Sequence, residues 1–194
     1  MIPALLEGDT DVPIVERLLE FVGLQLGTVY GLRGKNWIDA RLRNYNRAAL
    51  YGRWFVLRDL NGDADCAPSL IRTVLPEPAT GMCFRVAVRT AESWLLADRQ
   101  SAAKFLGVGV STIPNEPDSL PNPKQTLVNL ARRSRRRAIR EDMVPVRGTS
   151  SRVGPGYSSR IIEFATNLWR PGIAVERSPS LSRCVAALQR WAGT

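Results

Sequence analysis

The stretch Trp-Phe-Val-Leu-Arg-Asp-Leu-Asn-Gly-Asp-Ala-Asp, residues 54–65, decides the fold of this chain. It begins with a short apolar run rich in β-formers, which is typical of a buried central strand. It ends in Asp59, Asn61, Asp63 and Asp65, whose side-chain oxygens stand at alternating positions. Carboxylates packed this closely repel one another, and a bound divalent cation relieves the repulsion. The alternative is an acidic turn after the strand, because Asn, Gly and Asp are ordinary turn residues.

Composition sets the broad class of the chain. With 194 residues and 44% hydrophobic content, it is long enough to bury a core, and one compact domain is expected. No apolar run reaches membrane-spanning length and residues 1–7 lack a basic leader, so we expect no membrane association and no signal peptide. Cys66, Cys83 and Cys184 are too scattered for a zinc site or a disulfide framework, which favours the reducing cytoplasm.

The net charge and the absence of histidine limit the catalytic groups and the ligands that this chain can use. Without histidine, Ser-His and Cys-His nucleophiles, His-ligated metals and His general bases are excluded. Catalysis would then rest on carboxylates, Lys, Arg, Tyr, Cys, or a hard oxygen-ligated metal such as Mg²⁺ or Mn²⁺. The net charge of +9 suits a partner rich in phosphate. The alternative is that the many arginines reflect only a GC-rich genome.

Apolar patterns predict strands that alternate with helices in the first half of the chain. We expect strands at 2–6, 26–30, 53–57 and 83–88, and helices at 12–22, 37–50, 67–75 and 91–105. This alternation is typical of βαβ units, so we predict an α/β fold with a mainly parallel sheet flanked by helices. Residues 1–106 form the predicted core, and residues 107–194 a helical extension packed on it, with helices at 124–141, 157–169 and 180–191.

Acidic residues follow several of the predicted strands. Glu7, Asp59 and Glu92 each stand at or just past a strand end. Function in parallel sheets gathers at the carboxyl ends of the strands, so these residues are expected to meet at one rim.

The acidic cluster partly matches several known motifs, but each of them requires a residue that this sequence lacks. The cluster has the first ligand spacings of an EF-hand loop, yet Ala64 replaces the required Gly and Leu70 the final Glu. Asp59-x-Asn61 is similar to the nucleophile loop of haloacid-dehalogenase phosphatases, but Asn61 replaces their general acid. No receiver-domain Lys follows Val88, and the loop at 153–157 is not a P-loop.

One family pattern fits better. Glu7-Gly8 after the first strand and Asp59-x-Asn61 after a later strand resemble the TOPRIM fold of topoisomerases, bacterial primases, small ribonucleases and OLD-type nucleases. Longer segments look like those of a TOPRIM-like bacterial family of uncharacterised activity: residues 6–11, 85–98, 122–125, 153–157 and 177–181. The resemblance implies a Mg²⁺ site, and a gene often found beside AAA or SMC-like ATPases; some relatives act in phage defence.

The resemblance also implies roles for the matching residues. Glu7 would be a metal ligand or general base, and Asp59 the principal metal ligand. Asn61 stands where the family has a second Asp, so the site loses one negative charge, and binding of one or two metals stays open. Asp63 or Asp65 would compensate for that loss as a further ligand.

Four more residues are candidates, each with an alternative. Asp11 matches a second acidic position of nuclease-type members, or is a helix N-cap. Glu92 completes the metal site, or is an ordinary first-turn helix acid. Lys124 stabilises a pentacovalent transition state, or begins a solvated helix. Tyr157, with the loop at 153–157, contacts a phosphate or base, or belongs to a surface turn.

An arginine-rich segment completes the list. On a single helix from Lys124, one broad face would carry Arg132, Arg133, Arg135, Arg136, Arg137 and Arg140. The packing face would carry Leu127, Leu130, Ala131, Ser134 and Ala138. We expect the arginine face to grip a phosphate backbone; the alternatives are a solvated face or a docking surface for an acidic protein such as a partner ATPase.

Two functional hypotheses follow. The first is a Mg²⁺- or Mn²⁺-dependent nuclease that hydrolyses phosphodiesters in DNA or RNA, and that would serve as the effector of an anti-phage defence system. The second is a catalytically weak partner subunit that binds nucleic acid beside an ATPase, which the neutral side chain of Asn61 favours.

Overall fold

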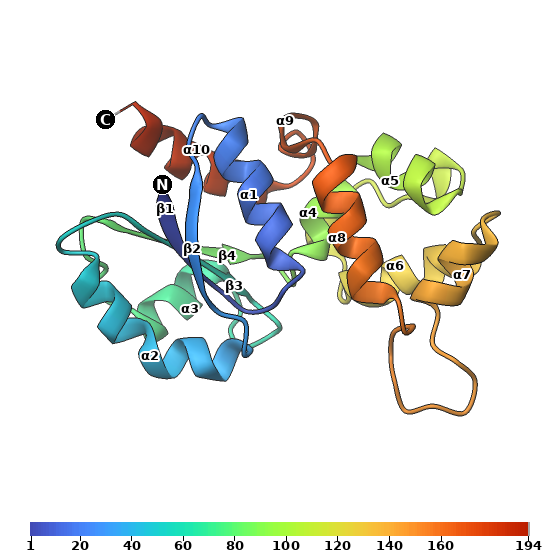
Figure 1. Cartoon of the computed structure of the whole chain (residues 1–194), viewed down its shortest axis with the longest axis horizontal. Helices are drawn as coiled ribbons and strands as arrows, with labels where there is room; N and C mark the ends of the chain where they lie inside the picture. Colours follow the sequence, from blue (N-terminus) through green and yellow to red (C-terminus); the bar gives the residue numbers. More distant parts are fainter. Residues whose placement is uncertain (194) are drawn as a thin grey trace.

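A four-stranded sheet forms the centre of the computed structural model, which describes residues 1–193 (Figure 1). The strands are β1 (Ile2–Leu6), β2 (Leu26–Gly31), β3 (Trp54–Asp59) and β4 (Met82–Ala87). Their order across the sheet is β2-β1-β3-β4, and every neighbouring pair is parallel. This arrangement confirms the α/β class and the parallel sheet expected from the alternating apolar pattern.

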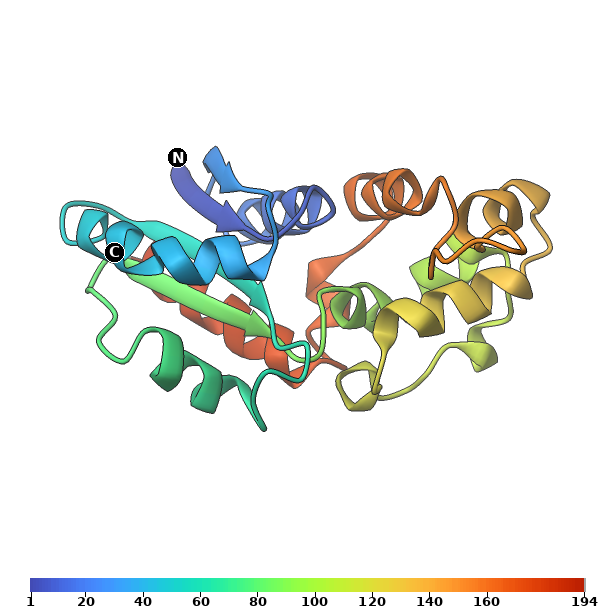
Figure 2. The ribbon, with the colours of Figure 1, turned by 90° about the horizontal axis from the view of Figure 1, so that it is seen from below.

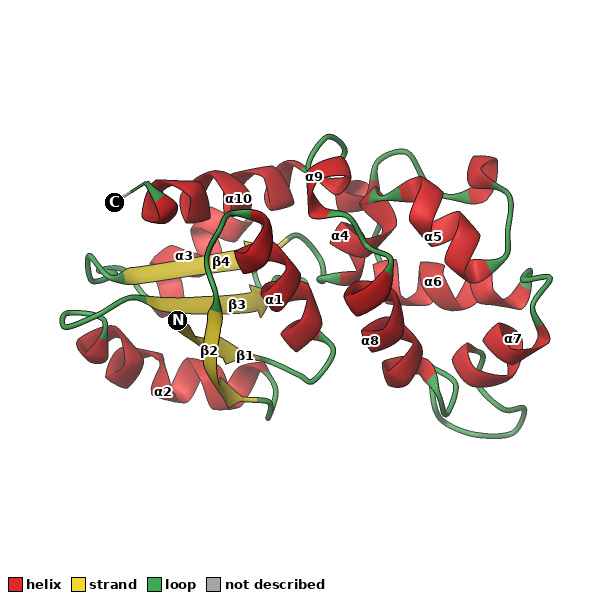
Figure 3. Cartoon of the chain, turned by 45° about the horizontal axis from the view of Figure 1, so that its top comes forward, coloured by secondary structure: helices red, strands yellow, loops and turns green. Residues whose placement is uncertain are grey.

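Helices cover both faces of the sheet because strand side chains point alternately to each face. On one face, α1 (Asp11–Phe21) and α10 (Pro179–Ala192) pack against side chains such as Phe55 and Leu57. On the other face, α2 (Lys35–Ala48) and α3 (Ala67–Val74) pack against side chains such as Val56. Figure 3 shows α1 in front of the strands and α2 and α3 behind them.

The remaining helices lie beyond the carboxyl ends of the strands (Figure 2). In chain order they are α4 (Glu92–Ala97), α5 (Arg99–Leu106), α6 (Pro123–Arg132), α7 (Arg137–Met143), α8 (Tyr157–Asn167) and the short α9 (Pro171–Ala174), with 3-10 turns at Val110–Thr112 and Pro117–Ser119. The core runs without a break from the sheet into these helices. No helix within residues 1–193 is long and apolar enough to cross a membrane.

The order of the chain differs from the order of the layers. Helices α4 and α5 precede residue 107 but lie among the helices beyond the strands, whereas α10 returns to the sheet (Figure 1). The predicted division at residue 106 therefore cuts across this arrangement, and the C-terminal helix covers the α/β part.

Two helices that the sequence pattern predicted as continuous are interrupted. The helix expected at 91–105 breaks at Asp98, whose carboxylate accepts a hydrogen bond from the Ser101 amide and binds Arg170 at 2.8 Å. The helix expected at 124–141 ends at Arg132 and resumes at Arg137. In both places, contacts with distant residues outweigh local helix preference.

Candidate active site

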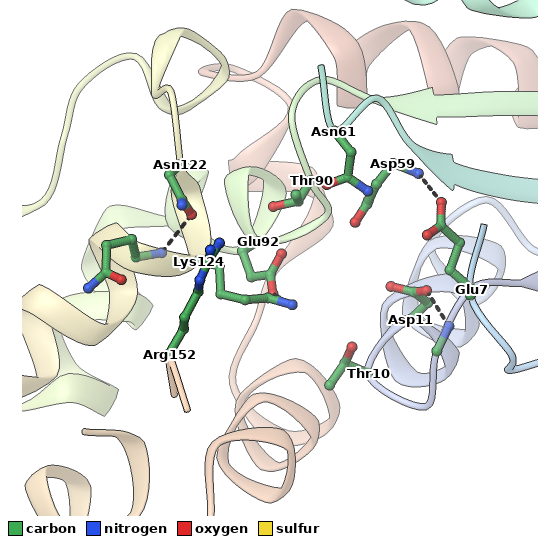
Figure 4. Close-up of a pocket in the computed structure, with 13 residues that line it drawn as sticks. Glu7, Thr10, Asp11, Asp59, Asn61, Thr90, Glu92, Asn122, Lys124 and Arg152 are labelled. Atoms are coloured by element: carbon green, nitrogen blue, oxygen red, sulfur yellow. Dashed lines mark hydrogen bonds and ion pairs between the residues drawn. The ribbon is translucent and has the colours of Figure 1, made fainter. Parts of the chain in front are cut away.

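A pocket of about 350 Å³ opens where the carboxyl ends of the strands face α6. It is lined by Glu7, Gly8, Thr10, Asp11, Gly34, Asp59, Asn61, Thr90, Glu92, Asn122, Lys124, Gln125 and Arg152. The carboxylates come from the sheet side and from the start of α4, while Lys124 and Arg152 reach in from the helical part (Figure 4). The structure thus brings Glu7, Asp59 and Glu92 together at one rim, as expected, and places Asp11 and Lys124 in the same pocket.

Glu7 and Asp59 are positioned by backbone hydrogen bonds across the strand ends. The Asp59 amide donates to Glu7 Oε1 at 2.8 Å, which ties the turn after β1 to the end of β3. Asp59 Oδ1 accepts from the Ala91 amide at 2.9 Å, at the start of α4. In each carboxylate, one oxygen accepts a backbone hydrogen bond and the other remains available to a further partner.

Asp11 closes the turn that contains Glu7. Its Oδ2 accepts a hydrogen bond from the Gly8 amide at 2.9 Å, and its side chain is buried. The N-cap position of α1 belongs to Thr10, so the carboxylate of Asp11 is not the cap of that helix.

Glu92 joins the two sides of the pocket. Its Oε1 lies 3.3 Å from Lys124 Nζ and accepts a hydrogen bond from the Tyr157 hydroxyl at 3.2 Å. The ammonium of Lys124 also stands 5.9 Å from the centre of the Tyr157 ring. The Tyr157 side chain is buried, so contrary to expectation it is not placed to contact nucleic acid; it holds Glu92 instead.

Burial and crowding disturb the ionisation of these acids. Burial, with the negative charges of Asp11, Glu92 and Glu7, raises the pKa of Asp59 well above its usual value. Burial, with the charges of Glu92 and Glu7, raises the pKa of Asp11 to about 7. Burial also raises the pKa of Glu7. Burial alone would lower the pKa of Lys124, but the facing carboxylates of Glu92, Asp59 and Asp11 raise it.

The donor chemistry of the pocket fits a hard divalent cation. Carboxylate oxygens are the protein ligands that Mg²⁺ and Mn²⁺ prefer, and Mg²⁺ keeps several waters, so few direct protein ligands suffice. In residues 1–193, no group of three or more Asp, Glu, Cys or His side chains is placed so that it could hold a metal ion as it stands. The hydroxyl of Thr90, in the pocket wall, is buried and has no hydrogen-bond partner within the described chain. Glu7, Asp11, Asp59 and Glu92 therefore share one pocket without forming a ready-made metal site.

In the loop after β3, one polar residue lines the pocket and another forms ion pairs outside it. Asn61 lines the pocket in a left-handed backbone conformation, φ 49°. Its backbone N–H donates a hydrogen bond to the Arg89 carbonyl at 3.0 Å. Asp63, expected as a metal ligand, turns away from the pocket. It pairs with Lys35 and with Arg58, and the hydrogen bond from Lys35 contributes most to lowering its pKa.

Arg58 fixes this loop and was not singled out from the sequence. Its buried guanidinium donates to both oxygens of Asp39, at 3.0 and 2.9 Å, and to Asp63 at 2.8 Å. Such a bidentate pair is geometrically specific, so Arg58 holds the start of α2 and the loop after β3 in one position.

The arginine-rich segment does not form the single face that the sequence predicted. The helix break at 133–136 arises where the Arg135 amide donates to the Gly107 carbonyl and the Ser134 hydroxyl accepts from the Arg136 amide. Arg140 donates to the Ser134 carbonyl, and Ala138, expected on the packing face, is exposed.

Several of these arginines are already engaged. Arg136 donates to the Phe105 carbonyl at 3.3 Å, and Arg137 pairs with Glu141 at 2.7 Å. Arg132 and Arg133 are exposed at the end of α6 remote from Lys124. The segment therefore offers scattered charges rather than a continuous phosphate-binding face.

Sequence reasoning missed Thr90, Asn122 and Arg152 in the pocket wall. Asn122 caps α6 by accepting from the Gln125 amide at 2.9 Å, a role that the Asn-Pro start of the helix signals. Arg152 lies on the loop between α7 and α8, and only the fold brings it to the pocket.

Comparisons with protein-family models, curated proteins and solved structures found no match for this chain. The TOPRIM resemblance therefore remains an expectation drawn from its motifs.

Proposed function

We propose that this protein is a Mg²⁺- or Mn²⁺-dependent phosphodiesterase that cleaves nucleic acid. The observation that carries the proposal is the cluster of Glu7, Asp11, Asp59 and Glu92 in one pocket facing Lys124. The crowding raises the pKa values of Asp11 and Asp59. An arrangement that costs stability in the free protein is commonly found where a site serves chemistry.

In this proposal the carboxylates on one side of the pocket bind the cation, and Lys124 on the other side binds the phosphate. Glu7, Asp11 and Asp59, at the sheet edge, would hold the cation, and Glu92 would complete the set. A divalent cation, when bound, supplies an activated water and neutralises charge on the scissile phosphate. Lys124 would then exchange part of its contact with Glu92 for a phosphate oxygen, where its charge stabilises the developing negative charge.

A phosphodiester substrate also suits the cationic groups of the pocket. Lys124 and Arg152 enter it from the helical part, and the Asn122-capped amino end of α6 lies beside them. Cations and a helix amino end favour an anionic ligand. The net charge of +9 adds long-range attraction for a polyanion.

To test this proposal, the protein is incubated with plasmid DNA, single-stranded DNA or tRNA in the presence of Mg²⁺, Mn²⁺ or EDTA, and cleavage of the nucleic acid is measured. We expect cleavage of at least one substrate with metal and none in EDTA. Asp59→Ala should abolish cleavage, whereas Asp65→Ala should not, because Asp65, expected as an alternative ligand, is exposed and does not line the pocket. Full activity of Asp59→Ala would overturn the proposal.

A second candidate is a nucleic-acid-binding subunit of weak or no activity that works beside an ATPase. It is favoured by the neutral Asn61 and by the lack of a closed three-ligand cage in the described chain. This candidate predicts nucleic-acid binding in EDTA and no cleavage with either metal.

A further inference from the structure

Helix α2 and the residue just before its N-cap carry a row of side chains that the proposed chemistry does not use. Trp37 and Arg41 are four residues apart and lie on one face of α2, and Arg33 stands just before Gly34, the N-cap of that helix. The guanidinium of Arg41 lies 4.3 Å from the centre of the Trp37 ring, and that of Arg33 lies 5.9 Å from it. The ring is thus flanked by two cations, one from α2 and one from the segment before it.

These two arginines are not neutralised by the protein. Both are exposed, and no carboxylate in residues 1–193 forms an ion pair with either. Asp39, the carboxylate of α2 itself, is held by Arg58. Trp37 is half-buried against the core beneath α2, which anchors the ring. Two exposed positive charges that have no acidic partner in the described chain suit an anionic ligand.

The row leads into the candidate active site. Gly34, next to Arg33, lines the pocket, and its amide donates to the Glu7 carbonyl at 2.9 Å. From there α2 runs away from the strand ends along the sheet (Figure 1). Both guanidiniums lie within 5.9 Å of the Trp37 ring centre, so the two charges flank one aromatic ring. A ligand that contacts both arginines therefore lies over Trp37, and it reaches the pocket past Arg33 and Gly34.

The stacking has a physical consequence for binding. A guanidinium held against an aromatic ring loses less conformational freedom when it binds phosphate, and its planar donors match phosphate oxygens. We propose that Arg33 and Arg41, positioned by Trp37, form a phosphate clamp for the backbone of a nucleic-acid strand that leads out of the pocket. This inference rests on the proposed function, because it assumes that the pocket takes a nucleic-acid strand.

The binding test uses a fluorescein-labelled single-stranded oligonucleotide, fluorescence anisotropy and EDTA, so that cleavage plays no part. Replacing both arginines, Arg33→Ala with Arg41→Ala, should lower the slope of log affinity against log salt by about 1.4, or about 0.7 per lost contact. Arg43→Ala is the control, since it removes an exposed charge from another face of α2. Its slope should match that of the unmodified protein.

Trp37 is tested as a positioning residue. Trp37→Ala leaves both charges in place, so we expect an unchanged salt slope but an affinity about two- to fivefold weaker, the worth of an exposed cation–π contact. Trp37→Phe should restore most of that loss because it keeps a ring. Arg41→Lys should keep the slope and still weaken binding, since an ammonium lacks the planar fork. Circular dichroism checks that each variant is folded.

The outcomes separate this inference from the proposed function. If Asp59→Ala abolishes cleavage while the double arginine variant binds with an unchanged slope, the clamp is overturned and the nuclease stands. If the clamp variants behave as expected but no metal supports cleavage, the clamp stands as a binding site and the nuclease falls. If the unmodified protein binds no oligonucleotide, or Trp37→Ala binds as tightly as Trp37→Phe, the clamp is overturned.

Discussion

At the scale of single residues, Asp11 makes the metal-free protein sensitive to pH. Its pKa rises from 3.8 to about 7 on folding, because the side chain is buried near Glu92 and Glu7. Between these values the folded protein binds a proton that the unfolded chain does not. The stability that this carboxyl contributes is therefore present below about pH 4 and is lost as pH rises through about 7.

Asp11→Asn should remove this loss. In EDTA at about pH 8 we expect the variant to be more stable than the unmodified protein by a few kcal/mol, since one pKa unit corresponds to about 1.4 kcal/mol. Near pH 4 the two proteins should unfold at the same urea concentration. Asp9→Asn, at an exposed position in the same turn, serves as the control. A variant no more stable at pH 8 would show that Asp11 is not strained by its neighbours.

Tyr157 is the residue whose expected role changed most, from a surface contact to a support for Glu92. Tyr157→Phe removes the hydroxyl that donates to Glu92 Oε1 and keeps the buried ring. We expect cleavage to slow by roughly ten- to a hundredfold, because a hydrogen bond to a charged group contributes about 1.5–3 kcal/mol. Binding in EDTA should stay the same. Weaker binding at an unchanged cleavage rate would instead restore the surface role.

The pocket acids were predictable because they follow a simple rule. Glu7 directly follows β1 and Asp59 is the last residue of β3, and the ends of parallel strands meet at one edge. Where the site differs from the prediction, tertiary contacts are the reason. Asp63 pairs with the buried guanidinium of Arg58 instead of lining the pocket, and Arg152 reaches the pocket on a loop whose path no local sequence pattern predicts.

At the scale of elements, the strands and the helices beside the sheet could be predicted from periodicity alone, because each alternates or repeats its apolar residues against a single core. The two helix breaks could not. At Asp98, a carboxylate binds Arg170 from a distant part of the chain. At 133–136, the backbone turns to meet the carbonyl of Gly107. Neither partner is visible from the local sequence.

Gly107 tests the second break. It ends α5 in a left-handed conformation, φ 65°, and an added Cβ would lie 2.9 Å from Arg136 Cγ. Gly107→Ala should lower the free energy of unfolding by about 1–2 kcal/mol, measured in urea. Gly109→Ala, where an added Cβ meets only Ser111 Oγ at 3.7 Å, is the control. Equal unfolding midpoints for the two variants would contradict this account of the break.

At the scale of the whole molecule, the pocket exists because two parts of the chain are held together. Trp94 on α4 donates from Nε1 to Ser180 Oγ on α10 at 2.7 Å, and Trp169 Nε1 donates to the Trp94 carbonyl at 3.0 Å. These buried contacts join the helical part to the helix that covers the sheet. They keep Lys124 opposite the carboxylates at the strand ends.

The central claim is that these carboxylates hold a divalent cation, and titration with Mn²⁺ followed by electron paramagnetic resonance tests it most directly. Free Mn²⁺ gives the signal, so binding is measured without a substrate. We predict that the unmodified protein binds Mn²⁺ and that Mg²⁺ displaces it. Asp59→Asn should weaken binding by at least about tenfold because the carboxylate charge is lost, while Asp65→Asn should bind as the unmodified protein does. Equal binding by Asp59→Asn, or no binding by the unmodified protein, would contradict the claim.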